Sequence, residues 1–193
     1  TEGHIELVGA LDVLGAESES VLRQGMLATE IDPAVGGSSA NELDAALWSG
    51  RRPLSGVTAV AVLPFDHIRR ATSVLVDDST GRTLVTKGAP EQVLARCVDV
   101  PAAAHDTLDA LFAAGRRVVA VASRPAAGHR SISPADETGF TLDGFLVFAD
   151  NPKAAARQSL TQLAGLGIEV KVATGDNPTV AEKVCAELGL TSK

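Results

Sequence analysis

Aromatic side chains, cysteine and long apolar runs are all scarce in this sequence of 193 residues. Aromatic residues make up 3% of the chain and tyrosine is absent, so an aromatic ring outside a core pattern needs an explanation. Cys97 and Cys185 do not form a close pair, which argues against a metal site or a disulfide framework and favours a reduced, cytoplasmic setting. No apolar run approaches the roughly 20 residues that span a bilayer, and no signal peptide is visible.

Positive charge is also in short supply. The chain has 17 Lys and Arg against 24 Asp and Glu, which gives a formal net charge of −7. This balance argues against general binding to nucleic acids or anionic membranes, but it leaves room for a local basic site that holds an anion. The sequence contains no G-x-x-x-x-G-K-[ST] phosphate loop, no G-x-G-x-x-G and no recognisable Ser/His/Asp set.

The middle of the chain has the pattern of an antiparallel sheet with helices packed on it. Strand-like and helix-like stretches follow one another closely, and "DSTG" before residue 82 is a typical hairpin turn. A loop without periodicity covers residues 125–139. The predicted strands are 4–8, 58–65, 71–78, 82–87 and 116–124, and the predicted helices are 18–31, 40–50, 90–97 and 103–115.

The pattern changes at about residue 141. An apolar strand that ends in Asp150 is followed by a helix over 152–167, a second strand over 168–176 and a second helix over 177–190. This order predicts a parallel strand-helix unit of the Rossmann-like kind, which is too small to be a complete sheet. The expected fold class is therefore α+β: an antiparallel sheet with packed helices, plus a partial parallel α/β unit.

The stretch "LVTKGAPEQVLARC" predicts a strand, a tight corner and a helix. Lys87 ends the strand, and Gly88 has no Cβ to keep a flat ligand from the backbone. Pro90 suits the first turn of a helix, and Glu91 is favourable near its positive end. This geometry suits a bound phosphate or nucleotide, and the alternative is an ordinary connection between two elements.

Two further acidic positions follow the strands of the parallel unit. In "ATGDNP", Thr174 can donate its hydroxyl, Gly175 permits close approach, and Asp176 can stand near a magnesium ion. Asp150 in "ADNPK" has the corresponding position after the preceding strand. The carboxyl edge of a parallel sheet is where ligands bind, so these residues are candidates for a phosphate or magnesium site. The alternative is that they are helix caps.

An aromatic and basic segment, "LPFDHIRRATSV", offers a third candidate. Phe65 can stack on an adenine ring if it is exposed, and Arg69 and Arg70 can meet phosphates. The alternative is a core phenylalanine followed by a solvated basic turn. Asp44 in "NELDAAL" lies on the polar side of a short predicted helix, where it can equally be a surface acid.

Taken in order, these segments resemble the cytoplasmic nucleotide-binding region of P-type cation-transporting ATPases over nearly the whole chain. "TKGAPE" is similar to the family's K-G-A-P-E motif, and "PFD" with its basic cluster resembles the adenine-pocket segment. "NELDAAL", "GRRVVAVASR", "ADNPK" and "TGDN" resemble four further motifs of the family. "TEG" at residue 1 resembles the tail of the D-K-T-G-T-L-T phosphorylation motif.

The resemblance assigns roles to individual residues. It implies that Phe65 stacks on adenine, that Lys87 and Gly88 line the same pocket, and that Asp44 holds the adenine end. Arg70 and Arg117 would contact the phosphate chain. Four residues would lie near the transferred phosphate and its Mg²⁺: Asp150, Thr174, Gly175 and Asp176.

The resemblance also divides the chain. It implies a nucleotide-binding (N) domain over 8–140, flanked by parts of the phosphorylation (P) domain at 1–7 and 141–193. The phosphorylated aspartate would precede Thr1, so the fragment should bind ATP or ADP, with Mg²⁺ as cofactor of the parent, yet be inactive alone. The expected partners are the transmembrane and actuator domains of an integral membrane parent, with this part on the cytoplasmic face of the membrane. Asn151 and Glu42 depart from the family, each where a proline is usual.

Within the family, the sequence most resembles the bacterial magnesium-transporting branch, and calcium-type pumps come next. No His-Pro pair occurs, which disfavours the heavy-metal class. Two other hypotheses stay open at this point. One is a fragment of a haloacid-dehalogenase-like phosphatase, although no D-x-D-x-T motif is present. The other is a non-catalytic interaction domain with a vestigial nucleotide pocket.

Overall fold

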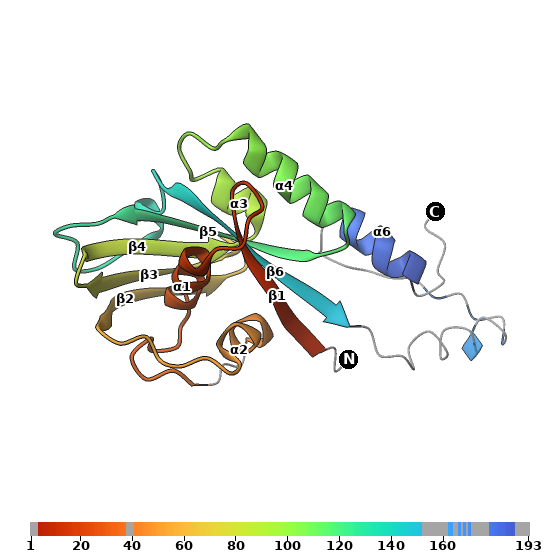
Figure 1. The fold of residues 1–193 in the computed structure, drawn as a ribbon, viewed down its shortest axis with the longest axis horizontal. Helices are drawn as coiled ribbons and strands as arrows, with labels where there is room; N and C mark the ends of the chain where they lie inside the picture. Colours follow the sequence, from red (N-terminus) through yellow and green to blue (C-terminus); the bar gives the residue numbers. More distant parts are fainter. Residues whose placement is uncertain are drawn as a thin grey trace.

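A six-stranded antiparallel sheet forms the centre of the fold (Figure 1). The computed structural model describes residues 4–37, 41–151 and 178–187, with residues 162, 163, 166, 168 and 170. The strand order is β1-β6-β5-β4-β3-β2, and every neighbouring pair is antiparallel. The predicted α+β class is thereby confirmed. The strands are β1 (His4–Asp12), β2 (Val57–Asp66), β3 (Ala71–Asp78), β4 (Gly81–Gly88), β5 (Arg117–Pro125) and β6 (Thr141–Asn151).

Helices cover both faces of the sheet, so its central strands are buried on both sides. One apolar cluster joins the sheet to α1 and α2 through residues such as Leu27, Leu47 and Val85. A second cluster joins the opposite face to α3 and α4 through Val93, Leu108 and others. The helices are α1 (Glu19–Leu27), α2 (Glu42–Trp48), α3 (Pro90–Leu94), α4 (Ala102–Ala113) and α6 (Pro178–Glu187), with a 3-10 turn η1 (Pro134–Asp136). Within the described part of the chain, no helix is long and apolar enough to cross a membrane.

Local signals account for several element boundaries. Ser18 caps α1, because its side chain accepts a hydrogen bond from the Val21 amide. Pro90 occupies the first turn of α3, where its missing N–H costs nothing. β3 and β4 are joined by a tight turn in which Asp78 pairs with Gly81. The start of α3 at Pro90 and the β3–β4 turn match the sequence predictions, and α1 begins within one residue of its predicted start at 18.

β6 differs from the parallel unit that was predicted to begin there. It pairs antiparallel with β5 and with β1, whose first residue His4 lies opposite Asn151. An unbroken apolar run is typical of parallel strands, but any strand covered on both faces has the same pattern. β6 is such a strand, since Phe145 and Phe148 belong to opposite clusters. The second predicted strand, 168–176, lies mostly outside the described residues, and the proposed domain boundaries stay a prediction.

Candidate functional site

A buried lysine and a buried aspartate lie at the centre of the candidate site. Nζ of Lys87, near the end of β4, donates a hydrogen bond to Oδ1 of Asp44 in the first turn of α2. Their side chains are only 8% and 4% exposed. The pair holds because α2 is anchored on the sheet by the buried side chains of Leu47 and Trp48.

Two opposing influences act on the protonation of Lys87. Burial lowers the pKa of the Lys87 amine, and the carboxylates of Asp44 and Glu30 act in the opposite direction. A buried ion pair contributes little net stability, because the loss of hydration offsets the attraction between the charges. Stability alone therefore does not explain why this pair is buried.

Phe65 lies near the end of β2 with 44% of its surface exposed. Its ring makes an edge-to-face contact with His67, at 5.3 Å between centroids. Glu30, which follows α1, interacts with the Phe65 backbone and acts on Lys87 through its charge. Its Oε1 accepts a hydrogen bond of 3.2 Å from the Phe65 amide. The phenyl ring is thus outside the interior and available for stacking on a flat ligand.

Arg70 and Gly88 meet at the corner beside Lys87. The Ala89 amide donates to the Arg70 carbonyl at 2.9 Å. A Cβ on Gly88 would overlap that same carbonyl oxygen and come within 2.8 Å of Ala71 Cα. Glycine is therefore required here by the approach of the neighbouring backbone, whatever access it also gives to a ligand. Arg70 has a φ of 49°, and its guanidinium pairs with Glu91 at 2.7 Å.

Arg117 begins β5 on the same face of the sheet as Lys87. Lys87 lies opposite Val121, and alternate residues along β5 bring Val119 and Arg117 to that face. Arg117 therefore lies past the end of β4, beyond the corner at Gly88. Arg117 is four residues along β5 from the position opposite Lys87. At the usual rise per residue, a ligand that contacted both side chains would extend about 13 Å along the strand direction.

The predicted phosphate and magnesium side is described only in part. Asp150 lies on β6 opposite Ile5 of β1, where its backbone joins the antiparallel ladder. Thr174, Gly175 and Asp176 lie outside the described residues. Among the described residues, no cluster of three His, Cys, Asp or Glu side chains could hold a metal ion.

Three residues near the site were not assigned by sequence reasoning. Glu30 was not singled out, Arg69 was considered only as a possible phosphate ligand, and Glu137 was placed in a featureless loop. The structure turns Arg69 inward, where its Nη1 lies 2.5 Å from Oε1 of the buried Glu137. No local motif could have identified these contacts, because Glu30 and Phe65 are 35 residues apart and Arg69 and Glu137 are 68 apart.

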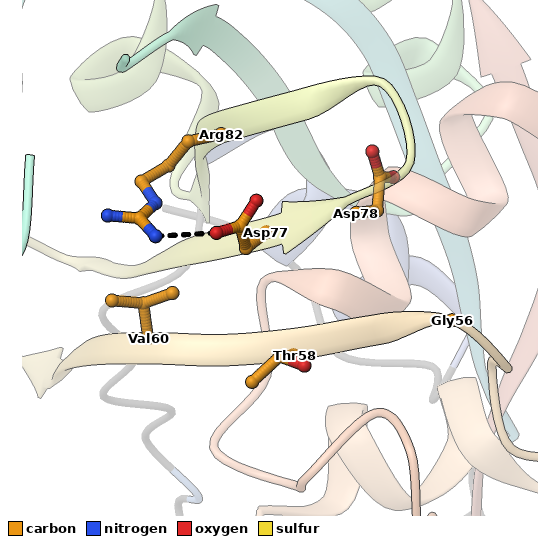
Figure 2. A pocket seen from close by; sticks show the side chains of 6 residues that line it. All are labelled: Gly56, Thr58, Val60, Asp77, Asp78 and Arg82. Atoms are coloured by element: carbon orange, nitrogen blue, oxygen red, sulfur yellow. Dashed lines mark hydrogen bonds and ion pairs between the residues drawn. The ribbon is translucent and has the colours of Figure 1, made fainter. Parts of the chain in front are cut away.

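A shallow hollow of about 400 Å³ lies elsewhere, at the far end of β2 and β3 (Figure 2). Asp77 and Asp78 line it, together with Arg82, which is paired to Asp77 at 2.5 Å. Asp78 is itself paired to Arg23. Two carboxylates and an already paired arginine are a poor receptor for phosphate. This hollow therefore does not compete with the Phe65–Lys87 region as a nucleotide site.

Comparison with known proteins identifies the family. Residues 12–169 match the family described as "P-type ATPase, cytoplasmic domain N". The chain belongs to the P-type ATPase N domains. A "Magnesium-transporting ATPase, P-type 1" of Salmonella typhimurium is 35% identical over 214 residues, covering 98% of this chain and 23% of that protein. The Escherichia coli K12 protein of the same name is 34% identical with the same coverage.

A plant relative is similar over a shorter region. "Calcium-transporting ATPase 3, endoplasmic reticulum-type" of Arabidopsis thaliana is 31% identical over 146 residues, covering 67% of this chain and 15% of that protein. This N-domain chain thus spans less than a quarter of the curated relatives it matches. The resemblance to P-type ATPases is confirmed, whereas the activity of a whole protein is a separate question.

Proposed function

We propose that this N domain binds ATP, with the adenine ring stacked on Phe65 and flanked by Lys87 and Asp44. Arg70 and Arg117 would receive the phosphate chain. The observation that carries the proposal is the exposed Phe65 ring on the same sheet as the buried Lys87–Asp44 ion pair, with Glu30 bonded to the Phe65 amide and its charge acting on Lys87. An aromatic face and a buried donor–acceptor pair are the groups that a purine needs, one for stacking and the other for its polar edge.

The proposal extends to the full-length protein. We propose that the parent is a P-type cation pump, with magnesium as the favoured cargo because the relatives with 98% coverage are named for magnesium transport. The domain would present the γ-phosphate to an aspartate that precedes Thr1. Asp150, Thr174, Gly175 and Asp176 would form the phosphate and Mg²⁺ side. Catalysis would then rest on positioning and charge neutralisation.

The test is a titration of the ¹⁵N-labelled chain with ATP, ADP and AMP, followed by amide shifts. We expect submillimolar to millimolar dissociation constants, on the order of −4 to −6 kcal/mol, with little dependence on Mg²⁺. Shifts should concentrate around Phe65 and Lys87. Phe65→Ala should weaken ATP binding roughly tenfold, because it removes the stacking surface for the base. Lys87→Ala should weaken it too.

Ile68→Ala is the matched control, since Ile68 is 89% exposed in the same segment. It should leave the dissociation constant within about twofold, as an exposed truncation away from the ligand does. If ATP produced no shift near Phe65 and Lys87, the pocket would be vestigial and the chain a non-catalytic interaction domain. If both Phe65→Ala and Lys87→Ala bound ATP normally, the pocket would lie elsewhere.

A further inference from the structure

Glu137 is a buried carboxylate with no role in the proposed contacts to nucleotide. Its side chain is 2% exposed, under the corner that joins β2 to β3. Oε1 accepts from Arg69 Nη1 at 2.5 Å and from Ser73 Oγ at 2.6 Å. Oε2 has no hydrogen-bond partner among the described residues, and Arg96 Nε lies 4.0 Å from it. A carboxylate buried this deeply requires a compensating cation, and Arg69 supplies it.

Arg69, which is held by Glu137, also binds the backbone immediately before Phe65. Its second terminal nitrogen, Nη2, donates to the Pro64 carbonyl at 2.5 Å. The guanidinium therefore bridges a fixed carboxylate and a backbone oxygen, which its planar fork permits and a lysine amine could not reproduce with the same rigidity. Arg96 adds support, because it donates to the Gln92 carbonyl at 2.8 Å and approaches the Arg69 carbonyl at 3.4 Å.

The peptide group between Pro64 and Phe65 is thus held at both of its polar atoms. Arg69 binds its carbonyl oxygen, and Glu30 binds its N–H. A planar peptide fixed at both ends restricts the direction in which the following side chain leaves the backbone. The Phe65 ring is 44% exposed, so these two hydrogen bonds contribute to the direction in which the side chain leaves the backbone.

We propose that Glu137, acting through Arg69, is a positioning residue that orients Phe65 for stacking on the nucleotide base. This inference rests on the proposed ATP site. It assigns Arg69 a different task from Arg70, its neighbour in the chain: Arg70 pairs with Glu91 at a partly exposed position, whereas Arg69 is committed to the interior. The effect of Glu137 should therefore be on binding of the base, so adenosine and ATP should be affected alike.

The experiment compares wild type with Glu137→Gln, which keeps the shape of the side chain and removes its charge. Dissociation constants for ATP and adenosine are measured by amide shifts at a temperature at which each protein is fully folded. We expect both constants to rise by roughly five- to tenfold, as expected for a lost charged hydrogen bond that organises the site. Backbone ¹⁵N order parameters over 65–70 should also fall in the variant.

Asp77→Asn is the matched control, because it breaks another arginine–carboxylate pair of 2.5 Å at the opposite end of β3. It should leave both dissociation constants unchanged. If Glu137→Gln does not fold, Arg69→Lys tests the same link with its charge retained, and the same loss is expected. Unchanged or tighter binding of adenosine in the folded variant would overturn the inference alone. Failure of wild type to bind ATP would overturn the proposed function and the inference with it.

Discussion

At the scale of single residues, the site combines groups that are costly to bury. Lys87 and Asp44 are held out of water together, and a charge left without its partner would cost several kcal/mol. Each residue was predicted as a ligand from the family resemblance, but their mutual pairing was not. The pairing depends on how α2 packs against β4, across 43 residues of sequence.

Asp143 on β6 is another ionisable residue whose burial disfavours its charged form. Burial raises the pKa of its carboxyl group to about 6, against the hydrogen bond from Ser123 Oγ at 3.1 Å. Its Oδ2 is buried and has no partner among the described residues. Because the folded pKa is raised above the unfolded value, the ionised carboxylate destabilises the fold. Stability should therefore fall as pH rises from about 4 to 6, and the full cost applies above this window.

Asp143→Asn should remove this cost while keeping an acceptor for Ser123. The variant is expected to be more stable than wild type at pH 7.5 by on the order of 2 kcal/mol, and the difference should shrink toward zero near pH 4. Urea unfolding at the two pH values provides the measurement. An equal difference at both pH values would show that protonation of Asp143 is not the cause.

At the scale of elements, the corner between β4 and α3 carries a strict geometric demand. Gly88 lies against the Arg70–Ala71 backbone, which has little freedom to move because Ala71 also pairs with Gly88 in the β3–β4 ladder. An added methyl group must push the two strands apart, and such overpacking costs about 1–3 kcal/mol.

Gly88→Ala is therefore expected to lower the free energy of unfolding by about 1–3 kcal/mol in urea titrations. Gly9→Ala in β1 is the control. Its added Cβ would meet only the end of the Leu11 side chain at 4.0 Å, so the change should be neutral or slightly stabilising. Equal effects of the two substitutions would mean that the close approach at Gly88 does not determine its identity.

The elements that were predicted best are those with local causes. The starts of α1 and α3 and the β3–β4 hairpin have causes in their immediate neighbours, so the sequence was sufficient to place them, whereas α1 ends at Leu27 and not at the predicted residue 31. β6 was recognised as a strand, but its antiparallel partners depend on residues up to 147 positions away, as with His4 and Asn151. Glu30 and Glu137 were missed for the same reason, because their partners are distant in sequence.

At the scale of the whole molecule, the first and last strands of the sheet in sequence, β1 and β6, lie side by side. β1 enters and β6 leaves as an antiparallel pair, and His4 at the start of β1 lies opposite Asn151 at the end of β6 (Figure 1). A domain connected to its neighbours through two adjacent strands can move as a unit about that connection. Under the proposed function, such a connection would let the N domain carry a bound nucleotide toward a separate phosphorylation domain.

The most direct test of the account is the contact between the base and Phe65. In a sample saturated with ATP, intermolecular nuclear Overhauser effects should connect the adenine H2 or H8 protons with the Phe65 ring protons, because stacked rings lie within a few ångströms. Contacts between adenine and residues of the hollow at the far end of β2, such as Thr58 or Val60, would contradict the proposed site. So would a saturated complex in which the Phe65 ring shows no contact with the base.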